Sequence, residues 1–219
     1  MKKYLEILKR CPLFEGVGEA DMEHMLRCLG ARVEIFDKKY TVFAEGTPAR
    51  YLGIVLSGSV QVVQNDYYGN RNILSHVVSP NVFSEAYACA SVSALPVSVI
   101  ANEYSEIMLI DCAHVQYTCE RHCGHHQRLI YNLMKDLAQK TIQFHQRVEI
   151  TSKRTTREKL MTYLDTRARE TGKRSFEIPF DRQGLADYLE VDRSGLSAEL
   201  GKLRREGVLE CTKNKFTLL

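Results

Sequence analysis

The spacing of apolar residues changes twice along the chain, and this change limits the folds that it can adopt. Between Ala31 and Cys112, apolar residues occur in brief β-branched and aromatic runs that Gly, Asn-Asp and Ser-Pro turns separate. Several short strands of this kind predict an antiparallel roll or barrel. The expected strands cover 32–36, 41–46, 51–58, 59–66, 72–78, 97–102 and 106–111. Helical spacing over 3–29, interrupted by Pro12, predicts short helices before them.

A long helix is expected after the β-rich region. Apolar positions follow a 3-4-4-3-4 spacing at Ile130, Leu133, Leu137, Thr141, Phe144 and Val148. The helix would continue for about 25 to 30 residues after Gly124 without Gly or Pro, which is long for a helix that packs only locally. A stripe of this kind also packs against its own domain, but this spacing is typical of a two-stranded coiled coil. We therefore predict a parallel homodimer through this helix.

The last third of the chain is predicted to form a compact helical unit with a terminal hairpin. The expected elements are a helix over 154–170, a strand over 176–180, two helices over 182–190 and 193–207, and a hairpin over 208–219. Gly172 suits a helix C-cap, and Asp181 and Asp192 suit the N-caps of the two short helices. The hairpin turn is expected at Lys213-Asn214. This pattern predicts a winged helix-turn-helix.

The second short helix of this unit has the composition of a DNA recognition helix. Its outward N-terminal face carries Arg193, a side chain that reaches guanine bidentately in a major groove. Arg182, at the start of the first helix, suits backbone phosphate. The candidate DNA-binding residues are Arg182, Gln183, Arg193, Ser194, Ser197, Ala198 and Lys202. The alternative is a helical hairpin with a solvated, charged face.

The order of these elements resembles the CRP/FNR family of bacterial transcription regulators over nearly the whole chain. The resemblance is carried by residues 42–63 with turn glycines Gly46 and Gly58, by residues 82–111, and most specifically by residues 180–209. It implies an α+β fold and a homodimer that binds a small effector, or senses through a metal centre, inside its β-roll. The expected domains are a β-roll domain with N-terminal helices at 1–112, a dimerisation helix at 113–150, and a winged helix-turn-helix at 151–219.

The effector cassette departs from the cyclic-nucleotide binders of this family. Those proteins resemble one another in a Gly-Glu-Leu start and an Arg-Ser/Thr pair about ten residues later that neutralises the phosphate. Here the start is Ser84-Glu85-Ala86, and the later pair is Leu95-Pro96. A phosphate buried without a cation costs several kcal/mol, so we do not expect cyclic AMP. The alternative role for Glu85 is a carboxylate that caps a short helix beginning at Ala86.

The effector expected instead is an unidentified, neutral or weakly charged organic molecule, and no other cofactor is predicted. The candidate pocket comprises Ile73, Leu74, Ser84, Glu85, Ala86, Leu95, Pro96, Gln139 and Gln143. Coupling would arise because a ligand that touches both roll and helix favours one helix position.

A Cys/His cluster follows the β-rich region and suggests an alternative, redox- or metal-sensing regulator. The candidate ligands are Cys112, Cys119, Cys123, His122 and His126. The cluster lacks the close CxxC pairs of structural zinc sites, so packed cysteines are the alternative and no metal is predicted. An enzyme that uses Cys123 and a neighbouring His would need an oxyanion loop, which this sequence lacks, so we do not expect enzymatic activity.

Charge and composition fit a regulator that binds DNA. Of the formal net charge of +3, residues 151–219 contribute fifteen basic and eleven acidic side chains, a net +4, which leaves −1 for residues 1–150. The positive charge therefore lies in the part expected to meet a polyanion. Seven cysteines at irregular spacing favour reduced thiols, and the sequence shows neither a secretory signal nor a membrane span. We expect a cytoplasmic protein that binds a two-fold symmetric operator in double-stranded DNA, with RNA polymerase left open as a further partner.

Overall fold

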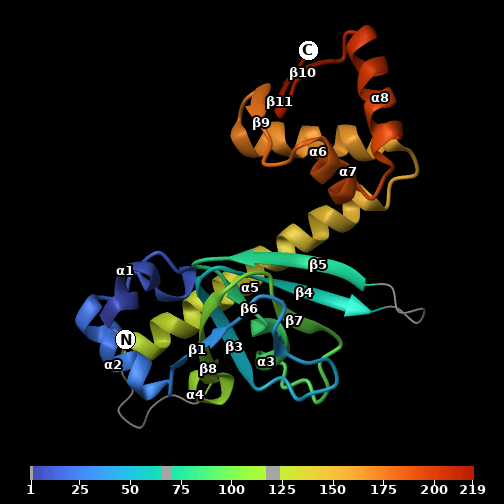
Figure 1. Ribbon diagram of the computed structural model, residues 1–219. Helices are drawn as coiled ribbons and strands as arrows, with labels where there is room; N and C mark the ends of the chain where they lie inside the picture. Colours follow the sequence, from blue (N-terminus) through green and yellow to red (C-terminus); the bar gives the residue numbers. More distant parts are fainter. Residues whose placement is uncertain (1, 66–70, 117–123) are drawn as a thin grey trace. The chain divides into compact units, whose positions relative to one another are not determined.

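The computed structural model describes residues 2–65, 71–116 and 124–219 and divides the chain into two compact units, unit 1 (Met1–Gln139) and unit 2 (Lys140–Leu219). Figure 1 shows the elements of each unit. The helices that begin in unit 1 are η1 Lys2–Tyr4, α1 Leu5–Leu8, η2 Pro12–Phe14, α2 Glu19–Cys28, α3 Glu85–Cys89, α4 Cys112–Gln116 and α5 Gly124–Thr151. Its strands are β1 Arg32–Phe36, β2 Thr41–Phe43, β3 Tyr51–Ser57, β4 Ser59–Asn65, β5 Arg71–Val78, β6 Val82–Phe83, β7 Ser98–Ala101 and β8 Ser105–Asp111.

Unit 1 is an antiparallel β-roll, as the sequence predicts. Its described strands form two sheets with the orders β1-β8-β3-β6 and β2-β7-β4-β5. Gly58 connects β3 to β4 with φ +78°, a conformation that glycine adopts at little cost. Strand β7 alternates partly buried and buried residues, as a strand with one face toward the core does. The two-residue strand β6 is missing from the sequence-based prediction because it is too short to show a period.

The N-terminal helices and the first half of α5 cover one side of the roll. Leu129 and Leu133 of α5 are buried in one cluster with residues of α1, α2, β3 and β8. The buried Asn132 side chain donates hydrogen bonds to the carbonyl oxygens of Leu13 and Glu15, at 3.0 and 2.9 Å. The first half of α5 is therefore anchored to unit 1 by apolar and polar contacts.

Unit 2 contains the end of α5 and the predicted winged helix-turn-helix. Its further elements are α6 Thr156–Thr171, β9 Ser175–Glu177, α7 Arg182–Leu189, α8 Arg193–Arg205, β10 Leu209–Thr212 and β11 Lys215–Leu218. The strands pair in the order β10-β11-β9, and Thr212 lies opposite Lys215, which confirms the turn at Lys213-Asn214. Gly172 ends α6 with φ +65°, so the predicted C-cap is confirmed.

The predicted α+β class, with an antiparallel β-roll, a long helix and a winged helix-turn-helix, is confirmed. The boundary between the two compact units falls inside α5, between Gln139 and Lys140. Helix α3 begins at Glu85, so this carboxylate is the first residue of the helix and does not precede it. Among the described residues, no helix combines the length and the apolar character that crossing a membrane requires.

Candidate nucleic-acid interface and effector pocket

The two helices of the helix-turn-helix are fixed by one apolar cluster and two aspartate caps. Buried side chains come from both helices: Leu185, Ala186 and Leu189 from α7, and Leu196, Leu200 and Leu203 from α8. Asp181 accepts a hydrogen bond from the Gly184 amide at 2.7 Å, and Asp192 accepts one from the Gly195 amide at 2.9 Å. Both predicted N-caps are thus confirmed, and they fix where each helix begins.

The N-terminal face of α8 is exposed to solvent. Exposed residues on this helix are Arg193, Ser194, Ser197, Ala198 and Lys202. The Ser194 hydroxyl donates to the Asp192 carboxylate, and the Ser197 hydroxyl donates to the Arg193 carbonyl at 2.9 Å. No hydrogen bond or ion pair within the described residues holds the Arg193 guanidinium. Arg193 is therefore available for a bidentate contact, whereas both serine hydroxyls are engaged locally.

Two further DNA-binding candidates, Arg182 and Gln183, lie at the start of α7. Arg182 is half-buried, and its Nη1 atom is enclosed without a hydrogen-bond partner in the part of the chain that the structure describes. A buried guanidinium nitrogen without a partner is costly, which suits a site that an anion completes. Gln183 is exposed, but its amide donates to Asp187 at 2.8 Å.

Two acidic residues, Glu199 of α8 and Glu206 directly after it, are paired with a cation from α6. Arg157 donates to both carboxylate oxygens of Glu206, at 3.2 and 2.5 Å, and lies 3.7 Å from Glu199. The hydrogen bonds from Arg157 hold the pKa of Glu206 below its ordinary value. This pairing offsets negative charge on the recognition helix, where it would repel a phosphate backbone.

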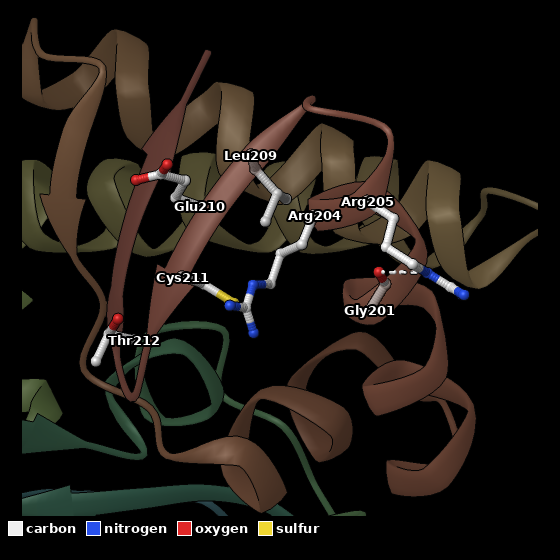
Figure 2. A pocket seen from close by; sticks show the side chains of 7 residues that line it. All are labelled: Gly201, Arg204, Arg205, Leu209, Glu210, Cys211 and Thr212. Atoms are coloured by element: carbon white, nitrogen blue, oxygen red, sulfur yellow. Dashed lines mark hydrogen bonds between the residues drawn. The ribbon is translucent and has the colours of Figure 1, made fainter.

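A hollow between the end of α8 and β10 adds two arginines beside the wing (Figure 2). It is lined by Gly201, Arg204, Arg205, Leu209, Glu210, Cys211 and Thr212. Figure 2 shows Arg204 extended toward Cys211 and Arg205 pointing away from it, with the Arg205 Nε donating to the Gly201 carbonyl at 3.3 Å. The sequence-based candidates omit Arg205, although the Arg204-Arg205 pair at the end of α8 is a visible signal.

The effector candidates lie in different environments. Ser84 adopts φ +61° ahead of α3, and its hydroxyl is buried without a hydrogen-bond partner among the described residues. Glu85 is buried at 5% exposure, whereas Ala86 is exposed. A hydroxyl and a carboxylate enclosed at one helix start are the polar groups expected of a small-molecule site.

Of the other effector candidates, Leu95 is also buried, whereas the rest are exposed. Leu95 is buried at 3%, and its backbone is hydrogen-bonded to Gly46 and Thr47, while Pro96 is exposed. Neither residue supplies a cation. Ile73 and Leu74 of β5 are 56% and 42% exposed. Gln139 and Gln143 are exposed on α5, the first in unit 1 and the second in unit 2.

The Cys/His cluster is only partly within the described residues. Cys112 is buried at the start of α4, and the buried His126 ring contacts the His114 carbonyl through Nε2 at 3.3 Å. Cys119, His122 and Cys123 lie outside the described residues. Within the ranges 2–65, 71–116 and 124–219, no group of three or more His, Cys, Asp or Glu side chains is placed to hold a metal ion.

The exposed face of α5 differs from the predicted dimer seam. Leu133, which the seam includes, is buried in the core of unit 1, so this part of the prediction is wrong. The exposed residues with 3-4-3-4-3 spacing are Tyr131, Met134, Ala138, Thr141, His145 and Val148. Tyr131 and Met134 are 59% and 64% exposed. The face available to a second helix is therefore shifted by one residue around the first half of α5.

Each of the two units matches a family model. Residues 33–122 match the family model of the cyclic nucleotide-binding domain, and residues 158–219 match that of the Crp-like helix-turn-helix domain. The chain is 32% identical over 80 residues to a CRP-like cAMP-activated global transcriptional regulator of Mycobacterium tuberculosis. This match covers 36% of the chain and 35% of that regulator, so it spans about a third of the relative's length.

Two solved structures share the fold. CLP of Xanthomonas campestris, a c-di-GMP responsive global regulator, is 17% identical with a TM-score of 0.58, over 90% of this chain and 98% of that chain. DNR of Pseudomonas aeruginosa is 21% identical with a TM-score of 0.52, over 100% of this chain and 95% of that chain. At these identities, the similarity shows the fold alone.

Proposed function

Because the chain belongs to the CRP/FNR family, we propose that it is a homodimeric, sequence-specific DNA-binding transcription regulator controlled by a small effector in the β-roll. The observation that carries this proposal is the exposed, unpaired Arg193 at the N-terminal end of α8, within the described part of unit 2. A recognition helix presents this end to base edges in the major groove. Such a regulator acts in the cytoplasm, where its DNA lies.

The proposal gives the basic residues of unit 2 different roles. Arg193 would read a base, because its guanidinium is available for two parallel hydrogen bonds with guanine. Arg182 would bind a phosphate, because its enclosed Nη1 atom has no partner among the described residues. The Arg204 and Arg205 side chains beside the wing would add positive charge for the backbone. Contacts of the first kind give specificity, and those of the second kind give affinity.

The proposed effector is not a cyclic nucleotide. Leu95 and Pro96 stand where the resemblance to cyclic-nucleotide binders requires a cation and a hydroxyl, and Leu95 is buried. Desolvating a phosphate beside Leu95 is unfavourable. The buried Glu85 and the Ser84 hydroxyl suit a ligand that donates hydrogen bonds to them.

The test of DNA recognition starts from a duplex selected by the wild-type protein from a random pool. We expect Arg193→Ala to cost about 1–3 kcal/mol, or about 5- to 150-fold in affinity, on the selected duplex and little on a random one. Arg182→Ala should weaken both and reduce the salt dependence of binding by about one phosphate contact. Fluorescence anisotropy titrations at several salt concentrations measure both effects.

The matched control is Arg169→Ala, which removes an exposed arginine of α6 that is paired with Asp165. It should leave affinity for both duplexes nearly unchanged. An equal loss on selected and random duplexes for Arg193→Ala would show that Arg193 contacts phosphate. Failure to enrich any duplex, with a folded wild-type protein, would refute sequence-specific binding.

A further inference from the structure

Two thiols that are far apart in the sequence meet between α3 and α4. Cys89 is the last residue of α3, and Cys112 is the first residue of α4. Their Sγ atoms lie 3.2 Å apart, so that one thiol donates a hydrogen bond to the other. The pair connects the segment that begins with Glu85 to the end of β8.

The two thiols have different surroundings. Cys112 is 2% exposed, whereas Cys89 is only partly buried. The hydrogen bond from Cys112 lowers the pKa of Cys89, although burial and the nearby Glu85 carboxylate oppose this shift. The hydrogen bond with Cys89 is the main cause that raises the pKa of Cys112, and burial is the second. A more accessible thiolate beside a buried thiol is the arrangement of an attacking and a resolving cysteine.

We propose that Cys89 and Cys112 form a redox-active pair that a hydroperoxide converts to a disulfide. The Cys89 thiolate attacks the terminal peroxide oxygen, the O–O bond breaks, and the alcohol or water leaves with a proton from solvent. Cys89 is then a sulfenic acid. The Cys112 sulfur attacks the Cys89 sulfur, the S–S bond forms, the S–O bond breaks, and the Cys112 proton leaves with the hydroxyl as water. Two thiols are oxidised and one peroxide is reduced.

The contact geometry favours this pairing over Cys11 and Cys28, the other described cysteines of unit 1. Cys11 is buried in the core with the N-terminal helices. Cys28 is exposed, and its Sγ atom contacts the His24 ring at 3.7 Å. A disulfide requires its two sulfur atoms to approach to about 2.05 Å. For Cys89 and Cys112 this approach is a movement of about 1 Å from the observed 3.2 Å contact.

The disulfide would join the candidate effector segment to the segment that leads toward α5. Glu85 lies four residues before Cys89 on α3. Asp111, directly before Cys112, accepts hydrogen bonds from the Arg50 Nε at 2.6 Å and the Ala113 amide at 3.0 Å. The bond would thus connect α3 to a point that is already fixed. A change in DNA affinity on disulfide formation rests on the proposed function, whereas the redox chemistry needs only unit 1.

The test uses the full-length, reduced protein and hydrogen peroxide. Remaining thiols are blocked with N-ethylmaleimide, and non-reduced peptides are mapped by mass spectrometry. We expect loss of two thiols per chain and a peptide pair linked through Cys89 and Cys112, which dithiothreitol separates. Cys112→Ala should stop the reaction at a Cys89 sulfenic acid that dimedone traps. Cys28→Ser is the matched control and should leave the linked pair unchanged.

Other outcomes overturn the pairing. A wild-type disulfide from Cys89 to a different cysteine, a disulfide between chains, or oxidation of Cys28 ahead of Cys89 would each do so. The wild-type map decides the matter even if a variant fails to fold. DNA affinity is measured separately on oxidised and reduced protein. A linked pair without DNA binding in either state refutes the proposed function alone, whereas DNA binding without a linked pair refutes the redox proposal alone.

Discussion

The exposed face of α5 gives a quantitative prediction about dimerisation. Met134 is the second residue of the 3-4-3-4-3 series that runs from Tyr131 to Val148. Its side chain is 64% exposed, and Leu133 beside it is buried in the core of unit 1. We predict that Met134→Asp dissociates the dimer while unit 1 stays folded. Leu133→Asp should instead unfold unit 1, because it buries a charge in an apolar core.

The magnitude follows from the area that a partner helix would cover. Complete burial of a methionine side chain contributes about 1.5–3 kcal/mol. Since 64% of Met134 is exposed, covering this part contributes about 1–2 kcal/mol per copy and about 2–4 kcal/mol per dimer. At about 1.4 kcal/mol for each factor of ten, the dissociation constant should rise by roughly 30- to 700-fold. Repulsion between the two introduced carboxylates adds to this increase.

Sedimentation equilibrium across a concentration series measures the dissociation constant, and far-UV circular dichroism confirms that the variant is folded. Gln143→Asp is the matched control, because Gln143 is exposed on α5 nine residues after Met134. At about 100° per residue, this spacing places it on the opposite face of the helix. Equal weakening by both variants, or a monomeric wild type, would refute the proposed interface.

Three further predictions concern unit 1. An added Cβ at Gly58 would lie 2.4 Å from both the Ser105 Oγ and the Tyr104 carbonyl oxygen, whereas at Gly46 no described atom lies within 4 Å; φ is positive at both. In urea denaturation, Gly46→Ala should cost about 1 kcal/mol and Gly58→Ala about 1–3 kcal/mol more; equal losses would contradict the contact argument. Burial raises the pKa of Asp111, but hydrogen bonds from Arg50 and Ala113 outweigh it and hold this pKa below its ordinary value of 3.8. The unfolded state therefore binds more protons, so stability should fall as pH drops through the folded-state pKa; Asp111→Asn should reduce this slope, and an unchanged slope would exclude Asp111 as its source. Calorimetry should detect no binding of cyclic AMP or cyclic GMP; micromolar affinity that Glu85→Ala abolishes would overturn the interpretation of Leu95 and Pro96.

Local patterns in the sequence predict most of the fold. The β-branched runs give the strands of the roll, and Asp181, Asp192 and Gly172 give the helix ends, because a cap acts within three or four residues of its own position. The same locality explains the missing strand. Val82 and Phe83 pair with β3 only because the chain returns to that sheet edge.

Tertiary packing decides what the sequence leaves open. The first half of α5 carries apolar residues on two adjacent faces, and only the contacts of unit 1 determine that Leu133 is buried while Met134 is exposed. Cys89 and Cys112 are separated by the segment that forms β7 and β8, so their proximity depends on the sheet topology. Burial of Leu95 beneath the Gly46-Thr47 turn likewise follows from backbone hydrogen bonds between distant residues.

The anchoring of α5 limits how an effector can act on this protein. In unit 1, Leu129 and Leu133 are buried, the Asn132 amide binds two carbonyl oxygens, and Lys135 lies 2.7 Å from Glu15. In unit 2, Ile150 of the same helix is buried in the helix-turn-helix core.

A ligand shifts an equilibrium only by the difference between its affinities for the two states. Losing the burial of one leucine and the hydrogen bonds of the Asn132 amide would cost more than the 1–3 kcal/mol that is typical of coupling between sites. An effector at Glu85 would therefore have to favour a second arrangement in which these contacts are kept or replaced. Such an effector is expected to move the first half of α5 together with the N-terminal helices that hold it.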